Sequence, residues 1–513
     1  MTDVVFAFEV HQPFRVKKNY FWERKMFQRL TKDEFFNYYF DRVGDQEIFK
    51  RVSRKCYFPT NRIILNLIDQ YKSEKKQVKI AFSLSGVFLE QCEKFNKDVL
   101  ESFKQLAETN CVEFLGQTYY HSLCGLYPTE NEFIEEVKMH RQTIHDLLGC
   151  EPKVFENTEL LYNNPIAKAV ENLGYLGIFM EGVERVLKNR SPNYVYLASD
   201  CEKLKILLRN YKLTDDIGFR FSSRWWKEWP LTADKYTSWL ATTPGQCITI
   251  FPDYETFGEH HWPETGIHEF LYHLISKILN HPNLDMTTPT EVINKHKPVD
   301  SIDVPDLSTV SWADLERDTS GWLGNTMQWA YYTTVRNMEE LVKESQDSIF
   351  IKTWRYFQLS DHLYYMFTAG GTPGEVHSYF SPYVTPTDAF VTCQSAITDF
   401  EMRLRLFTVA SKEPFQFYIG LGKEKYTGKT AWSLRGFIKA ISRVPIKSLE
   451  FHTNRGNFES WARFSLQNEN LADQLHSIRK SGLKGEDLRS AVTNAAEKCF
   501  VESSKKAKDF GYY

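Results

Sequence analysis

The sequence predicts an α/β protein: a barrel of parallel strands and helices, followed by a helical region and a small C-terminal α+β domain. Three observations favour this fold. The 513 residues exceed what one hydrophobic core usually supports. The first part of the chain alternates short apolar runs with longer amphipathic ones, and after about residue 310 helical periodicity takes over. We therefore expect a barrel domain at residues 1–310, a helical region at 311–412 and a C-terminal domain at 413–513.

Short runs rich in β-branched and aromatic residues predict the strands, at residues 4–10, 78–84, 111–117, 153–159, 175–181 and 247–253. Between them, residues 59–74, 129–149 and 164–174 carry apolar residues at helical spacing, and the second of these ends at Gly149. Strands that alternate with helices indicate a parallel sheet, and at this length a closed or nearly closed barrel is favoured over an open sheet. No dinucleotide-binding or P-loop glycine motif follows these strands.

The later part of the chain predicts helices at residues 323–345, 349–368 and 387–410, with a glycine-rich loop at 369–375. From about residue 415 the composition changes again, which indicates the small C-terminal domain.

Charge and cysteine usage exclude several classes of protein. Charged residues make up 25% of the chain and the net charge is -3, so there is no electrostatic footprint for nucleic acid. The nine cysteines are spread singly, which argues against a zinc cluster or a disulfide framework. No signal-peptide pattern and no apolar run of about 20 residues is present, so we expect a cytoplasmic protein without a membrane segment. The oligomeric state stays open.

Polar side chains stand where the predicted strands end, and in a (β/α) barrel the reacting groups lie at that face. They are Glu9, His11 and Gln12 after the first strand, Gln117 and His121 after the third, Asn157, Thr158 and Glu159 after the fourth, and Asp253 at the start of the acidic and aromatic run DYETFGEHHW. Four strand ends would thus aim carboxylates and imidazoles at one mouth.

A pair of carboxyl groups at this mouth would suit cleavage of a glycosidic bond. Glycoside hydrolysis with retention uses one carboxylate to attack the anomeric carbon and one carboxylic acid to protonate the leaving oxygen. Glu159 and Asp253 could supply the pair. Glu156 is a rival for the first role, but in an extended strand a spacing of three places Glu156 and Glu159 on opposite faces.

Five segments resemble, in order and spacing, the five motifs of glycoside hydrolase family 57, specifically its α-amylase-like branch. They are HQP (11–13), YYHSL (119–123), FENTELLYNN (155–164), DYETFGEHHW (253–262) and SWADLERDTSGWLGN (311–325). The resemblance covers roughly residues 1–400. The segment after about 415 resembles a small domain of unknown role that is appended to such proteins.

The resemblance implies an incomplete (β/α)7 barrel and a retaining hydrolase that acts on α-1,4-glucans such as starch, glycogen and maltooligosaccharides, without a metal or other cofactor. It assigns Glu159 as the nucleophile and Asp253 as the general acid/base. The substrate-binding positions that it implies are His11, His121, Glu255, Trp262, Trp312 and Asp314.

Three alternatives stay open. A 4-α-glucanotransferase or branching enzyme of the same family would use the same two acids. A glucan-binding or regulatory protein could reuse the barrel without catalysis. A metal-dependent polysaccharide deacetylase would need an Asp-Asp pair after the first strand and an H-x-x-x-H spacing, and the sequence offers neither.

Overall fold

A computed structural model describes residues 1–24, 28–368 and 381–509 of the chain. These residues form two compact units. The first contains residues 1–15, 41–329 and 358–386, and the second contains 16–40, 330–357 and the chain from 387 onward. The division at residues 310 and 412 stays a prediction, because the compact units group the chain in a different way. The expected loop at 369–375 lies outside the described residues.

The first unit is built around a ring of parallel strands. Around the ring the order is β8 (Cys247–Ile250), β1 (Thr2–Val10), β2 (Ile80–Leu84), β3 (Val112–Phe114), β4 (Val154–Phe155), β5 (Gly177–Glu181) and β7 (Lys205–Arg209). The ring closes at two narrow joints: Gly116 bridges Phe155 between β3 and β4, and Arg209 pairs with Thr249 between β7 and β8. This is the incomplete seven-stranded barrel, and the predicted α/β fold class is confirmed.

Further strands lie outside the ring. β6 (Tyr196–Ala198) runs antiparallel to β7, β10 (Ser301–Ile302) pairs with β6, and β9 (Leu284–Met286) pairs with β1. The six strands predicted from the sequence are all present, but β7 of the ring and the three short strands outside it were not predicted. The sequence of β7, KILLR, has only a three-residue apolar run between two basic residues, too short for a clear pattern.

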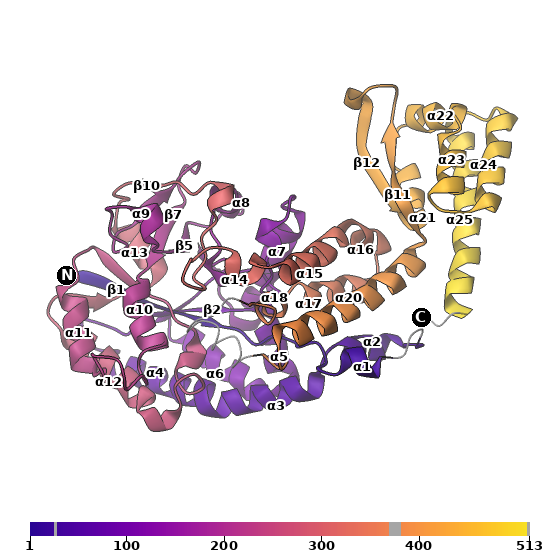
Figure 1. Ribbon diagram of the computed structural model, residues 1–513. Coiled ribbons are helices and arrows are strands. Elements are labelled where there is room, and N and C mark those ends of the chain that lie inside the picture. The colour runs from indigo at the N-terminus through magenta and orange to yellow at the C-terminus, as the bar shows by residue number, and fades with distance from the viewer. Residues whose placement is uncertain (25–27, 369–380, 510–513) are drawn as a thin grey trace. The chain divides into compact units, whose positions relative to one another are not determined.

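Helices cover the outside of the barrel, and Figure 1 shows α4, α6, α11 and α12 running together along one side of it. The helices of this unit are α3 (Arg42–Val52), α4 (Phe58–Tyr71), α5 (Gly86–Phe95), α6 (Lys97–Glu108), α7 (Asn131–Leu148), α8 (Asn164–Asn172), α9 (Glu184–Leu187), α10 (Tyr211–Gly218), α11 (Ala233–Thr242), α12 (Ile267–Asn280), α13 (Pro289–Lys295), α14 (Ser320–Leu323) and α18 (Ser360–Tyr364). The end of α7 at Gly149, which has a φ of 68°, is as the sequence predicts.

The barrel interior is filled with small and apolar side chains, which leaves the polar groups to the strand ends. Val5 and Ala7 from β1, Phe179 from β5 and Leu207 from β7 are all buried in one cluster. Alternate side chains of each strand face the barrel interior. The residues that follow the last interior position therefore lie at the mouth formed by the carboxyl ends of the strands. The interior is therefore a packed core, and the chemistry is confined to its carboxyl-end face.

The second unit joins a helical part to a small α+β part. Its elements are α1 (Tyr20–Glu23), α2 (Lys32–Tyr39), α16 (Glu339–Ser345), α17 (Ser348–Phe357), α20 (Pro386–Thr408), β11 (Ala410–Tyr418), β12 (Tyr426–Ser433), α21 (Leu434–Ile441), α22 (Ile446–Asn454), α23 (Asn457–Phe464), α24 (Glu469–Ser481) and α25 (Gly485–Asp509), while α15 (Thr326–Asn337) spans both units. In Figure 1 the β11–β12 hairpin stands beside α21 to α25, and Phe415 packs on Phe437, Phe458 and Trp461. No helix in the described part of the chain is long and apolar enough to cross a membrane.

Candidate active site

Glu159 stands in a strained turn directly after β4. The strand ends at Phe155, and Glu159 and Leu160 then adopt φ values of 60° and 51° in a short 3-10 turn, Thr158–Leu160. A left-handed backbone is uncommon for residues other than glycine, and it costs of order 1–3 kcal/mol. Such outliers cluster at functional sites, where the surrounding structure holds them in place.

The strained turn is held by residues of the fifth motif. The carbonyl oxygen of Glu159 accepts hydrogen bonds from the Ser311 hydroxyl at 2.7 Å and from the Trp312 backbone N–H at 3.3 Å. The orientation of the Glu159 carboxyl thus depends on residues more than 150 positions away.

Several donors converge on the Glu159 carboxylate, whose side chain is 15% exposed. The Trp312 indole N–H donates to Oε2 at 2.8 Å, and the Ser360 hydroxyl donates to Oε1 at 2.8 Å. His121 Nε2 lies 3.4 Å from Oε1. Donors aimed at a carboxylate stabilise its charged form, which is the form that can attack an anomeric carbon.

His11 and His121 lie face to face beside Glu159, with ring centroids 4.0 Å apart. His11 contacts Ser85 Oγ at 2.7 Å and Asp361 Oδ2 at 3.0 Å. Burial and then the charge of His121 lower the pKa of His11 to about 4. Burial also acts to lower the pKa of His121, but the hydrogen bond to Glu159 and the charges of Glu9 and Glu159 outweigh it and raise that pKa to about 9. The stacked pair therefore carries one positive charge at neutral pH, on His121.

Asp253 follows β8, and its backbone forms a parallel β-bridge with the backbone of Glu9 at the neighbouring strand end. Within the described residues no side chain or backbone N–H donates to its carboxyl. Burial and then the charge of Glu159 raise the pKa of Asp253 to about 7, although Arg209 and His121 act in the opposite direction. A half-buried carboxyl with this pKa holds a proton near neutrality and can release it, as a general acid/base requires.

A buried ion-pair network lies next to these acids. Arg209, the last residue of β7, donates to Glu181 at 2.7 Å and to Asp215 at 2.8 Å, and Arg317 contacts the same two carboxylates at 3.1 and 2.9 Å. The Arg209 guanidinium also lies 5.6 Å from the centroid of the Trp312 ring. The network fixes one wall of the site, and the charge of Arg209 reaches Asp253.

Glu156 and Glu159 do not lie in one extended strand, contrary to the expectation from the sequence. The expectation assumed an extended strand through both residues, whereas the strand ends at Phe155 and the left-handed turn redirects Glu159. Glu156 is buried, accepts a hydrogen bond from Ser83 at 3.0 Å, and lies close enough to Glu159 for its charge to affect the pKa of Glu156. Both acids therefore belong to one cluster.

The remaining predicted positions differ in how they relate to the cluster. Glu255 is buried against Tyr57 Oη at 2.5 Å and Gln12 at 3.5 Å, and burial raises its pKa to about 8. Asp314 is half-buried and caps the Leu315 N–H. Trp262 lies apart: its side chain is 54% exposed, and its ring is contacted by the Lys55 ammonium at 4.5 Å.

Three neighbours of the acids were not predicted from the sequence: Ser360, Asp361 and Tyr364, all from α18. The hydroxyl of Tyr364 has its pKa raised by burial and then by the charges of four carboxylates, namely Glu159, Asp253, Asp314 and Asp361. Burial acts to raise the pKa of Asp361, but the adjacent His11 and His121 outweigh it and hold that pKa well below its usual range. The polar triplet SDH inside the aromatic run 349–368 is the signal that could have found them.

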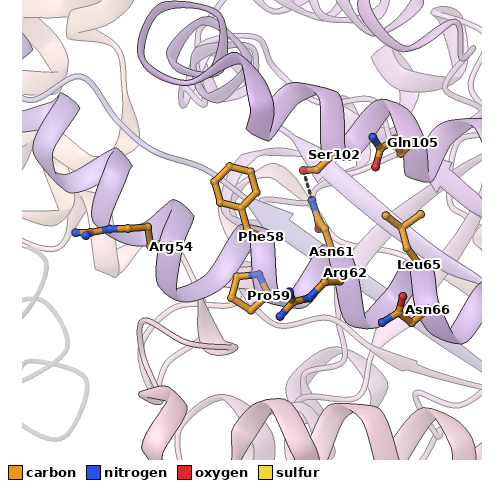
Figure 2. Close-up of a pocket in the computed structure, with 9 residues that line it drawn as sticks. All are labelled: Arg54, Phe58, Pro59, Asn61, Arg62, Leu65, Asn66, Ser102 and Gln105. Atoms are coloured by element: carbon orange, nitrogen blue, oxygen red, sulfur yellow. Dashed lines mark hydrogen bonds between the residues drawn. The ribbon is translucent and has the colours of Figure 1, made fainter.

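A separate groove of 470 Å³ lies on the outside of the barrel between α4 and α6, shown in Figure 2. It is lined by none of the acids described above. Its buried Asn61 donates to Ser102 at 2.8 Å and accepts from Tyr254, the neighbour of Asp253, at 2.6 Å. Asn61 thus connects the wall of the groove to the loop that carries Asp253. Within the described residues no group of three or more His, Cys, Asp or Glu side chains is arranged to hold a metal ion.

Two carboxyl groups in unlike environments at the mouth of a seven-stranded α/β barrel fit an enzyme that cleaves glycosidic bonds. The family model of glycosyl hydrolase family 57 matches residues 5–305. The chain is also 45% identical over 416 residues to a protein of Methanocaldococcus jannaschii named "Putative alpha-amylase". The matched residues cover 78% of this chain and 85% of that protein. The chain therefore belongs to glycosyl hydrolase family 57, and it is a glycoside hydrolase.

Solved structures share the fold at low sequence identity. A branching enzyme of this family from Pyrococcus horikoshii matches with a TM-score of 0.56 and 12% identity, covering 80% of this chain and 90% of that one. The 4-alpha-glucanotransferase of Thermococcus litoralis matches with a TM-score of 0.53 and 15% identity, covering 84% of this chain. This chain spans 62% of that glucanotransferase, which is less than two thirds of its length.

Proposed function

We propose that this protein is a retaining α-amylase-type hydrolase that cleaves α-1,4-linked glucans such as starch, glycogen or maltooligosaccharides. The observation that carries the proposal is the contrast between its two carboxyl groups at the barrel mouth. Glu159 accepts two hydrogen bonds and faces a protonated imidazole, whereas Asp253 has no protein donor among the described residues and has its pKa raised to about 7. The first environment suits a nucleophile and the second suits a proton donor.

In the first step the Glu159 carboxylate attacks the anomeric carbon while Asp253 donates its proton to the glycosidic oxygen. The C–O bond to the leaving sugar breaks, and an ester forms between the glucosyl unit and Glu159. In the second step Asp253 takes a proton from water while the water oxygen attacks the same carbon. The ester C–O bond breaks, and its electron pair restores the Glu159 carboxylate. Two inversions give net retention.

His11, His121, Trp312 and Asp314 are proposed to contact the sugar at this mouth. His121 and Trp312 contact Glu159, His11 stacks on His121, and the charge of Asp314 reaches Tyr364, as do those of the two acids. Glu255, in the loop after Asp253, is also proposed to bind substrate. Trp262 is proposed as an outer platform on which a longer glucan chain stacks. An aromatic ring that is half exposed can stack on the apolar face of a sugar ring.

The test is product analysis on maltooligosaccharides of defined length, with Glu159→Ala and Asp253→Ala as controls. Hydrolysis predicts only shorter oligomers with the α-configuration at the new reducing end. Loss of cleavage in both variants supports the assignment of roles. Full activity in either variant would overturn it.

A second candidate function is 4-α-glucanotransfer or branching. It is favoured by the fold match to a glucanotransferase and a branching enzyme, since all three reactions begin with the same glycosyl-enzyme. Products longer than the starting oligomer indicate transfer, and new α-1,6 linkages indicate branching. A protein that binds glycogen and releases no product would indicate instead a non-catalytic glucan-binding role.

We further propose a cytoplasmic location. No disulfide joins any of the nine cysteines, which all lie in the described residues, and seven of them are buried. Proteins of reducing compartments keep their cysteines in this form. Alkylation of the thiols in the protein isolated from its own cells would test the location, because a cytoplasmic protein yields all nine as free thiols.

A further inference from the structure

The mechanism above leaves two buried acids without a task. Glu9, near the end of β1, is 3% exposed, and Glu156, just past β4, is 1% exposed. Glu9 Oε1 lies 3.5 Å from His121 Nδ1, and Glu156 is close enough to Glu159 for the two charges to interact. Two carboxylates buried side by side repel each other, so a cluster of this kind is retained only if its charge is balanced.

The hydrogen bonds around Gln117 fix how Glu9 and Glu156 are connected. The Gln117 amide nitrogen donates to Glu9 Oε1 at 3.2 Å and to Ser83 Oγ at 2.7 Å. The Ser83 hydroxyl donates in turn to Glu156 Oε2 at 3.0 Å. Because both amide hydrogens of Gln117 are used, its oxygen is the atom that faces His121 Nδ1, at 3.2 Å.

This geometry determines the charge on His121. Its Nδ1 faces oxygen atoms of Gln117 at 3.2 Å and Glu9 at 3.5 Å, and its Nε2 faces Glu159 Oε1 at 3.4 Å. Oxygen acceptors on both sides require an N–H on both ring nitrogens, which is the imidazolium form.

His11 is neutral for a matching reason. The Ser85 hydroxyl oxygen accepts the Phe88 N–H at 3.1 Å, so its hydrogen is free to donate to His11 Nδ1. The His11 Nε2–H then donates to Asp361. The titratable groups that interact with His121 are therefore one neutral imidazole, His11, and the carboxyls of Glu9, Glu159, Asp361 and Asp253.

One atom of the cluster lacks a donor. Glu9 Oε2 is buried and accepts no hydrogen bond from the described residues. A buried carboxylate oxygen without a donor is costly, and a proton held between Glu9 and Glu156 removes that cost. Burial raises the pKa of both carboxyls, and the charge of Glu156 raises that of Glu9 further, which favours a proton on the pair at neutral pH.

We propose that Glu9 and Glu156 share one proton and act together as a positioning pair, whose single remaining negative charge keeps His121 an imidazolium against Glu159. When Glu159 becomes an ester, its own charge is lost, and the pair still neutralises His121. The His121 N–H then stands ready to receive the carboxylate as the ester breaks. The role at Glu159 rests on the proposed function, whereas the charge states of the pair and of His121 do not.

The first test needs no substrate and reads the wild-type protein, and its one variant serves only to assign signals. Imidazole ¹⁵N NMR of the wild-type protein, with the His121 signals assigned from the spectrum of His121→Gln, reports the protonation of His121 as pH rises. We expect both nitrogens to be protonated at pH 7.5. A single protonated nitrogen at that pH would overturn the proposal, whether or not the protein cleaves glucans.

The second test removes the charge of the pair. Glu9→Gln should lower the midpoint of the His121 titration by about one pH unit or more, because the nearest counter-charge is lost while the shape is kept. The fall of kcat/KM at alkaline pH should then become steeper. In the wild type it follows the loss of one proton, and in Glu9→Gln it should approach the loss of two. Glu9→Asp should restore much of the wild-type midpoint, since it restores the charge.

Glu113→Gln is the matched control. Glu113 is another acid on a barrel strand, in β3, and it accepts hydrogen bonds from Thr290 rather than from the site. Its substitution should leave the His121 midpoint unchanged. Equal midpoints in wild type and Glu9→Gln would sink the proposal, and absence of turnover in wild type with the expected NMR result would instead reject the proposed function.

Discussion

The turn that carries Glu159 and the loop that carries Asp253 follow two strands of the same barrel, yet they surround their carboxyl groups in opposite ways. Donors from Trp312, Ser360 and His121 meet the Glu159 carboxylate. The Asp253 carboxyl has no such donor in the described part of the chain, and the negative charge of Glu159 faces it. One fold thus prepares one acid to be charged and the other to hold a proton.

The two segments are also held in place differently. The turn at Glu159 is left-handed and is fixed by the backbone and side chain of the fifth motif. The loop after Asp253 packs against the π-helical turn Ser53–Tyr57, and Gly258 permits this because a Cβ there would lie 2.0 Å from the Lys55 carbonyl oxygen. A strained backbone thus carries the proposed nucleophile, whereas close packing holds the loop of the proposed proton donor.

Removal of either acid should give the largest effect and should separate the two roles. We expect Glu159→Ala and Asp253→Ala each to lower kcat by about 10⁴-fold or more on maltooligosaccharides, since each acid acts in both steps. On an aryl maltoside that needs no leaving-group proton, azide should give a β-linked product with Glu159→Ala and an α-linked product with Asp253→Ala, as read by NMR. The opposite pairing of products and variants would exchange the two roles.

Trp312→Phe tests the donors on the Glu159 side. It keeps an aromatic ring but deletes the indole N–H that reaches Oε2, so kcat/KM should fall about 10²-fold, as for loss of one preorganised donor. Steady-state kinetics on maltoheptaose measures the effect, with Trp239→Phe on α11 as the matched control. A fall confined to KM would mean that Trp312 binds sugar and does not act through Glu159.

The pH dependence tests the Asp253 side. Because the raised pKa keeps the Asp253 carboxyl protonated up to about pH 7, and because the first step needs that proton, kcat/KM should fall about tenfold for each pH unit above 7. Initial rates from pH 5 to 9 in buffers of constant ionic strength measure the limb. A constant rate up to pH 9 would contradict the assignment of Asp253 as the acid.

Ser360→Ala should give the smallest effect. Loss of its hydroxyl removes one neutral hydrogen bond to Glu159 Oε1, so kcat should fall about tenfold or less. Ser276→Ala, which removes a hydroxyl bonded to a carbonyl of α12, is the control. If Ser360→Ala costs more than Trp312→Phe, the ranking of the two donors is wrong.

The sequence predicted the barrel, its strand ends and the cluster around Glu159 and Asp253 because each strand end is a local pattern. It could not predict that Asp361 contacts His11, since 350 positions separate them and only the fold brings them together. It also predicted one strand through Glu156 and Glu159, whereas the strand ends at Phe155, because a left-handed turn at a non-glycine residue has no clear pattern in sequence.

The most direct test of the account is to trap the glycosyl-enzyme. An activated fluoro-maltosyl substrate whose ester hydrolyses slowly should label the protein once, and mass spectrometry of the digested protein should place the label on Glu159. We expect a modified peptide that contains Glu159, with fragment ions that exclude Glu156. A label on Glu156, or turnover of the reagent without any covalent adduct, would contradict it.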